Sequence, residues 1–485
     1  MSMKSTKQFG KNAPTSLKQE PFLWFRPMGM KRIAVLNVVG LTRSVIDEMP
    51  RLKKWSRERE VANFKPAFPA VTCTAQSSYL TGKSVGEHGI VGNGWYDRED
   101  AEVKFWKQSN HLVKGEKVWE AAGVRCAKMF WWYNMYSSAD FAATPRPIYP
   151  ADGRKFFDIH TQPMGMREEI KTDLGDFPFP SFWGPKAGIE SSDWIAKSAR
   201  WIEEKERPSL NLVYLPHLDY GLQKYGPGSP EMTAEYEAID KVTCDLIDFL
   251  EKREIEVLVL SEYGISKVSK SIHLNRIFRK KGWIQVKHEL GLETLDCGSC
   301  KAFAVADHQV AHVYVNDPSI AEEVREVVLA TDGVDEIREG CDLWGKEIGA
   351  DRGGDFVAVS EEDAWFTYYY WEDDSKAPDF ARCIDIHRKP GYDPVELFLD
   401  PKIKFPLVKI AGFLAKKKLG LRGLMDVIPL DANLVKGSHG RDNVVPQEQP
   451  VAIGRGAEQV TSAEKVFFWI RDSLKNSLSG DSTMG

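Results

Sequence analysis

The residues with the most chemistry in a short space lie between Phe68 and Gly82, where small side chains alternate with hydroxyl groups. This segment has the composition of a helix that begins after an apolar strand. A hydroxyl at the start of a helix lies beside amide groups that receive anions. It becomes a nucleophile when a base or a metal ion removes its proton. We therefore expect a nucleophile here, and the candidates are Thr72, Thr74, Ser77 and Ser78.

Three later segments carry acidic and imidazole side chains, which are the usual protein ligands of divalent metal ions. They are Tyr214–Pro227 with Asp219, Ser261–Gly264 with Glu262, and Gly437–Gly440 with His439. The hydroxyl segment, Glu87–Asn93 and these three follow one another in an order and spacing shared with a known family. The chain resembles the alkaline-phosphatase superfamily and, within it, the type I phosphodiesterase/nucleotide pyrophosphatase branch.

The resemblance implies a particular nucleophile. When Phe68-Pro69 and Thr81-Gly82 are aligned with the family pattern without gaps, Thr72 falls on the attacking threonine. Thr74, two residues further on, is the alternative nucleophile. A purely structural role for Thr72 is to cap the helix.

Asn93 matches the asparagine that, in the phosphodiesterase branch, hydrogen-bonds a non-bridging phosphate oxygen. Its amide is a neutral donor, which suits a diester because a diester carries less charge than a monoester. The alternative is that Asn93 is a left-handed turn residue between Gly92 and Gly94.

The metal ligands are matched in part. The resemblance implies that Asp219 and His439 are two of the three ligands of one metal ion. For the second metal ion, the only matched ligand is Glu262, which stands where the family has aspartate. At three further ligand positions the chain departs from the pattern and carries Val39, Gln223 and Tyr263.

Nearby residues could replace the lost ligands. On a strand, residues two apart point to the same side, so Asn37 could act for Val39, and His217 could reach the site of Asp219. A segment without a clear pattern holds Asp307, His308, His312 and His387, any of which could also fill a vacancy, although a lone histidine is more often structural. The predicted cofactor is one or two divalent ions. The family implies Zn²⁺, while an oxygen-rich ligand set also suits Mn²⁺ or Mg²⁺.

Periodicity predicts the elements that position these residues. Ile33–Val39, Leu210–Leu215 and Ile255–Leu260 are short apolar runs typical of buried parallel strands. Between the last two, apolar residues recur every three or four positions from Met232 to Leu250, which predicts a helix. Ligands of such α/β sheets bind at the carboxyl ends of the strands. Thr461-x-x-Glu464 predicts the start of a C-terminal helix.

The resemblance implies an α/β fold, the alkaline-phosphatase-like three-layer sandwich. In that fold a mostly parallel central sheet has helices on both faces and inserted cap segments. We expect one hydrolase domain over residues 31–475, with an insertion or cap within 265–400. Residues 1–30 and 476–485 are predicted to be flexible tails.

Net charge, hydrophobic patterning and cysteine content limit the possible partners and cellular location of the protein. The net charge of −5 gives no basic field for nucleic acid. No apolar run reaches the roughly 18 residues of a spanning helix, so no membrane partner is expected. Seven scattered cysteines indicate reduced thiols and a cytoplasmic protein, with a transit peptide in residues 1–30 as an alternative. The sequence does not indicate an oligomeric state.

Three functions are compatible with these features. The resemblance favours a metal-dependent hydrolase of a phosphate diester or phosphoanhydride that acts on a small molecule through a threonine nucleophile. The second is a phosphonate or phosphomonoester hydrolase on the same scaffold. The third is a non-catalytic binding protein derived from such an enzyme, because the missing ligands are what loss of a two-metal site would leave.

Overall fold

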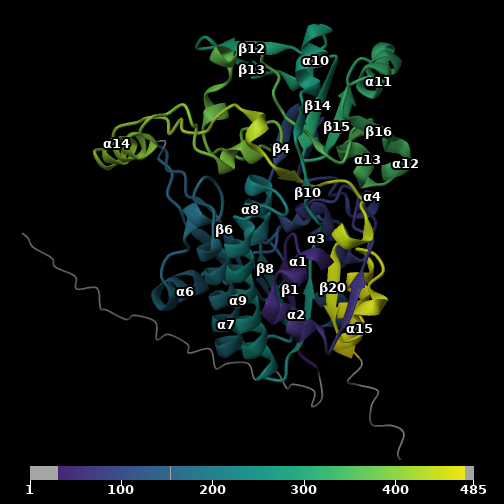
Figure 1. Ribbon diagram of the computed structural model, residues 1–485, viewed down its shortest axis with the longest axis vertical. Coiled ribbons are helices and arrows are strands. Elements are labelled where there is room, and N and C mark those ends of the chain that lie inside the picture. Colours follow the sequence, from purple (N-terminus) through teal and green to yellow (C-terminus); the bar gives the residue numbers. More distant parts are fainter. Residues whose placement is uncertain (1–30, 153, 476–485) are drawn as a thin grey trace, which may run out of the picture.

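The computed structural model describes residues 31–152 and 154–475. The predicted terminal tails lie outside these residues. These residues form two hydrophobic cores. One surrounds a large sheet, and the other surrounds a smaller sheet above it in Figure 1.

The large sheet has eight strands in the order β2-β20-β9-β1-β8-β5-β6-β7. Its central members β9, β1, β8, β5 and β6 are parallel, while β2, β20 and β7 pair antiparallel at the edges. The mostly parallel α/β sheet is therefore confirmed. In sheet order the strands are Glu60–Asn63, Val451–Gly454, Glu256–Leu260, Ile33–Val38, Leu210–Leu215, Cys126–Met129, Phe141–Pro145 and Ile159–Gln162.

Helices cover both faces of this sheet. Figure 1 shows α7 (Ile189–Glu206) and α9 (Met232–Glu251) on one side and α3 (Thr72–Thr81) and α15 (Lys465–Lys475) on the other. The predicted strands and the helix between the last two are confirmed. The C-terminal helix is also confirmed, although it begins at Lys465, and Ser462 rather than Thr461 hydrogen-bonds Glu464.

The smaller core is built on an antiparallel sheet in the order β14-β15-β17-β16. These strands are Ala302–Asp307, Val310–Val315, Phe356–Ser360 and Val334–Glu339. Most of its buried members lie between Val268 and Val435, past residue 400, where the sequence placed the end of an insertion, and Tyr96 and Phe105 join them. The aromatic run Trp365–Trp371 lies in this core. We call this part of the molecule the cap.

Two details of the chain bear on the sequence predictions. All seven cysteines are free thiols. In the part of the chain that the structure describes, no helix is both long and apolar enough to cross a membrane.

Candidate active site

Thr72 is the first residue of α3, at the edge of the sheet where the parallel strands end. Its hydroxyl oxygen lies 3.0 Å from the phenol oxygen of Tyr263. Tyr263 donates its own hydrogen to Asp219 Oδ1 at 3.3 Å, so the phenol oxygen can accept the hydrogen of Thr72. Thr74, in contrast, donates its hydroxyl to the carbonyl of Ile90. Of the two threonines, only Thr72 faces the acidic residues.

Glu262 follows strand β9 and is fully buried. Its Oε1 accepts hydrogen bonds from Asn37 Nδ2 at 2.6 Å and from Gln76 Nε2 at 2.7 Å. Burial raises the pKa of Glu262 to about 8, against the lowering effect of hydrogen bonds from Gln76, Asn37 and Thr72. The carboxyl group is thus surrounded by neutral donors rather than by a positive charge.

Asp219 lies in helix α8 (His217–Tyr225), which begins directly after strand β8. Gln223, one turn further along, donates to Asp219 Oδ2 at 2.8 Å and accepts a hydrogen bond from Tyr392 at 2.8 Å. Burial raises the pKa of Asp219 to about 7. The glutamine that replaces the family's histidine therefore orients the carboxylate.

His439 follows the short strand β19 (Gly437–Ser438). Its Nδ1 lies 2.8 Å from the carbonyl oxygen of Ala70, so Nδ1 must carry the hydrogen and Nε2 a lone pair. Nε2 lies 3.7 Å from Asp219 Oδ1. The ring stacks on Tyr263 at 3.5 Å, and burial lowers the pKa of His439 well below its ordinary value. The neutral imidazole thus points its lone pair toward a carboxylate.

Asn93 joins the start of α3 to the cap. Its Oδ1 accepts the amide hydrogen of Cys73 at 3.0 Å, and its Nδ2 donates to Asp307 Oδ1 at 3.0 Å. Asp307 also accepts the backbone hydrogen of Asn93 at 2.8 Å and the Nδ1 hydrogen of His308 at 2.8 Å. Asn93 has no positive φ, so its interpretation as a left-handed turn residue is wrong.

Of three other candidate histidines, one lies in the site and two form contacts elsewhere. His308 lies in the site, 3.8 Å from the ring of His439 and 3.6 Å from that of Tyr392. His217 is in α8 and not on a strand, so the predicted two-residue alternation with Asp219 is wrong; its Nε2 lies 2.7 Å from Glu235. His387 contacts the carbonyl of Phe105 at 3.3 Å.

Two residues of the site have no counterpart in the sequence predictions. Gln76 lies four residues after Thr72, and this one-turn spacing on a helix is a signal that could have found it. Tyr392 comes from the cap, where the chain has no periodicity that would place it beside Asp219.

The donor atoms of the site can be compared with the needs of a metal ion. Within residues 31–152 and 154–475, no three His, Cys, Asp or Glu side chains form a group able to hold one. However, among the buried unpartnered atoms of the described residues, three of ligand type belong to this site: Glu262 Oε2, Asn37 Oδ1 and His439 Nε2. Buried polar atoms are rarely left unpaired. All three can offer a lone pair, so the residues fit a cation if amide and hydroxyl oxygens complete the ligand set.

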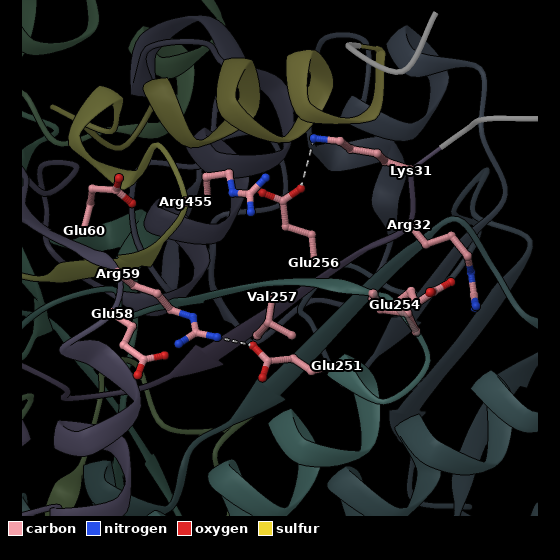
Figure 2. A pocket seen from close by; sticks show the side chains of 11 residues that line it. Lys31, Arg32, Glu58, Arg59, Glu60, Glu251, Glu254, Glu256, Val257 and Arg455 are labelled. Atoms are coloured by element: carbon pink, nitrogen blue, oxygen red, sulfur yellow. Dashed lines mark hydrogen bonds and ion pairs between the residues drawn. The ribbon is translucent and has the colours of Figure 1, made fainter. Parts of the chain in front are cut away.

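The opposite ends of the same strands carry a different polar cluster. A cavity of about 460 Å³ there is lined almost entirely by charged side chains. Figure 2 shows two pairs in it, Lys31 with Glu256 at 3.5 Å and Arg59 with Glu251 at 2.6 Å. These charges neutralise one another.

Solved structures of other proteins share this fold. A phosphonoacetate hydrolase from Sinorhizobium meliloti, solved with phosphonoformate, is 16% identical with a TM-score of 0.56, and the match covers 92% of this chain and 97% of that one. A murine ectonucleotide pyrophosphatase/phosphodiesterase 5, solved as an inactive variant with AMP, is 14% identical with a TM-score of 0.54 over 92% and 95% of the two chains. The alkaline-phosphatase-like fold is therefore confirmed.

The type I phosphodiesterase/nucleotide pyrophosphatase family model matches residues 33–393, so the chain belongs to this family. A pyrophosphatase/phosphodiesterase of Schizosaccharomyces pombe described as uncharacterized is 28% identical over 217 residues, which are 42% of this chain and 38% of that protein. Human ectonucleotide pyrophosphatase/phosphodiesterase family member 1 is 24% identical over 278 residues, which are 54% of this chain and 26% of that protein. The chain thus spans about a third of the length of these relatives.

Proposed function

We propose that the protein is a metal-dependent hydrolase of phosphate diesters or phosphoanhydrides, with Thr72 as its nucleophile. One observation carries the proposal. The hydroxyl at the N-terminus of α3 lies within a cluster that contains two buried carboxyl groups and three unpartnered atoms of metal-ligand type. Membership of the phosphodiesterase family supports the choice of reaction.

The residues of the chain have distinct roles in this proposal. Thr72 Oγ1 loses its proton and attacks the phosphorus while the bond from phosphorus to the leaving alcohol or phosphate breaks, and the leaving oxygen takes up a proton. Water then cleaves the threonine–phosphorus ester, which frees the phosphomonoester and restores the hydroxyl. Tyr263 holds the Thr72 hydroxyl in place through the 3.0 Å contact. Amide groups at the start of α3 receive the developing negative charge. Asn93 can add one N–H, because its Nδ2 carries two hydrogens and only one is donated to Asp307.

Four residues would hold the metal. Asp219 and His439 form one side of the site, and Glu262 with Asn37 forms the other, on either side of Thr72 and Tyr263. A divalent ion bound there would lower the pKa of the threonine hydroxyl and neutralise phosphate charge. The family implies zinc, whereas the predominance of oxygen donors favours manganese or magnesium. Gln223 and Gln76 fix the orientation of the two carboxylates.

The substrate in this proposal is a small phosphate or phosphonate compound. The two solved structures with a similar fold were obtained with AMP and with phosphonoformate, respectively. Activity on a phosphonate rather than a diester is the second candidate, and a panel of diester, monoester and phosphonate substrates separates them.

The test is the hydrolysis of bis(p-nitrophenyl) phosphate in the presence of Mn²⁺, Mg²⁺ or Zn²⁺. Thr72→Ala should lower kcat by at least about 10³-fold, because it removes the attacking oxygen. Thr74→Ala is the matched control, since it deletes the same hydroxyl two residues away and should keep most of the activity. Unchanged turnover in Thr72→Ala would overturn the mechanism.

A binding protein without catalysis is the alternative that the missing imidazoles favour. Metal titration of the purified protein distinguishes it. The enzyme should bind at least one divalent ion, and Glu262→Gln should weaken that binding. A wild-type protein that binds no metal but still binds AMP would support the alternative.

A further inference from the structure

Helix α14 (Pro406–Lys418) contributes little to either core. None of its thirteen residues is buried. Figure 1 shows it at the end of an arm, beside the main body of the molecule. Large apolar side chains are nevertheless exposed along the helix and the loop after it, namely Phe405, Leu407, Val408, Leu414, Leu419, Leu421 and Leu424.

Three apolar residues of α14 share one face. Leu407, Ala411 and Leu414 recur at the three- and four-residue spacing of a helix stripe. Leu407 is 69% exposed and Leu414 is 54% exposed, whereas Ile410 is half-buried against the cap core. A helix on the surface of a globular protein usually turns its apolar stripe inward. Here the stripe faces water, so another apolar phase or surface is needed to cover it.

The same segment is strongly basic. Residues 401–425 contain seven Lys or Arg and no Asp or Glu, although the whole chain has a net charge of −5. Three of the lysines, Lys416–Lys418, form the last turn of the helix. A positive charge this concentrated indicates a negatively charged partner.

The exposed apolar surface continues onto a neighbouring segment. Lys417 Nζ donates to the carbonyl of Lys155 at 2.8 Å and lies 5.8 Å from the centre of the Phe156 ring. Tyr149, Phe156 and Phe157 are exposed there as well. We call α14, the loop to Leu424 and these three aromatics the α14 surface.

We propose that the α14 surface binds an anionic phospholipid bilayer, with Leu407 and Leu414 inserted among the acyl chains and the lysines at the headgroups. An exposed apolar stripe flanked by basic residues is the pattern of a helix that lies in a membrane interface. Thirteen residues span only about 20 Å, so the helix lies on the bilayer and does not cross it. The sequence predicted no membrane partner, and this surface leads to the opposite expectation.

A second copy of the chain is a poorer occupant. In a symmetric dimer the same patch would meet itself, so the basic residues of one copy would face those of the other. The repulsion would oppose the apolar contact. An anionic bilayer satisfies both the apolar stripe and the positive charge.

The test is co-flotation of the full-length protein with vesicles. Vesicles with about 30% phosphatidylglycerol should capture the protein at about 0.15 M salt and release most of it at 1 M, while pure phosphatidylcholine captures much less. Leu407→Glu/Leu414→Glu should lower partitioning at least about tenfold. Lys416→Ala/Lys418→Ala should reduce the preference for anionic vesicles. Neither change removes a buried side chain, so both variants should fold.

Leu329→Glu in helix α11 (Ala321–Leu329) is the matched control, because Leu329 is 51% exposed and lies away from α14. It should partition like the wild type. Absence of binding to anionic vesicles, or equal binding by Leu407→Glu/Leu414→Glu, would overturn the proposal. So would a lipid-independent dimer in sedimentation velocity that the same double variant dissociates, since a second copy would then cover the helix.

Discussion

The two ends of strand β9 carry the same residue type in opposite situations. Glu256, at the amino end, is partly exposed and pairs with Lys31 at 3.5 Å. Glu262, beyond the carboxyl end, is fully buried and contacts the neutral amides of Asn37 and Gln76. One carboxylate already has its positive charge. The other is held in position by dipoles and has one oxygen without a partner.

This difference indicates which end of the sheet is suited to bind a cation. Burying a carboxylate without a cation is unfavourable, so a stable fold has no reason of its own to keep one. A bound cation would offset this unfavourable free energy by pairing with the buried carboxylate. In the proposed mechanism the carboxyl end of the sheet is therefore the reactive end, whereas the charges at the amino end pair with one another.

The same substitution at both ends of β9 tests this difference most directly. Glu262→Gln should lower kcat/KM for the diester by at least about 10²-fold and weaken metal binding, because it removes a ligand charge. The amide oxygen of the new glutamine can still accept from Asn37 and Gln76. Glu256→Gln should leave both quantities unchanged. Kinetics and metal titration of the two variants provide the measurement, and equal effects would remove the distinction between the ends.

A second prediction concerns the cap, whose Asp307 contacts the site through Asn93. Asp307 contacts Asn93 at two points and does not touch Thr72. Asp307→Asn should therefore lower kcat about 10- to 100-fold, as loss of an orienting partner does, while metal affinity stays near that of the wild type. An affinity loss as large as that of Glu262→Gln would mean that the cap supplies a ligand rather than orientation.

The sequence predicted the part of this site that the central sheet builds. The runs that form β1, β8 and β9 are apolar throughout, as strands buried on both faces must be. The strand ends predicted the positions of Asp219 and Glu262, the family resemblance added Thr72 and His439, and the structure brings these four together.

The sequence failed where local signals compete. Pro216 ends strand β8 and begins α8 at once, so His217 and Asp219 lie on a helix and point in different directions. The sequence predicted an insertion or cap within residues 265–400 but not its contacts with the site, because these contacts join residues far apart in the chain. Asn93 and Asp307, for example, are 214 positions apart. No periodicity encodes such a pair, and only the packing of the two cores brings Asp307 to Asn93.

The smallest expected effect is a change of thermal stability with pH. It tests whether the carboxyl groups at the carboxyl end of the sheet are buried without a cation. Burial raises the pKa of Asp219 to about 7 and that of Glu262 to about 8, so the folded metal-free protein binds these protons more tightly than the unfolded chain. The stability that they contribute is complete near pH 4 and is lost as the pH rises through 7 and 8. With chelator present, the Tm should therefore fall between pH 6 and about 8.5.

Glu262→Gln should flatten that decrease, because its amide does not titrate, whereas Glu256→Gln should not. Added divalent metal should stabilise the wild type more at the higher pH, since the ion binds the ionised carboxylates. Differential scanning fluorimetry over this pH range measures all three. If the decrease persists in Glu262→Gln and metal has no pH-dependent effect, then the buried carboxyl groups do not form a cation site, and the two ends of β9 differ in burial alone.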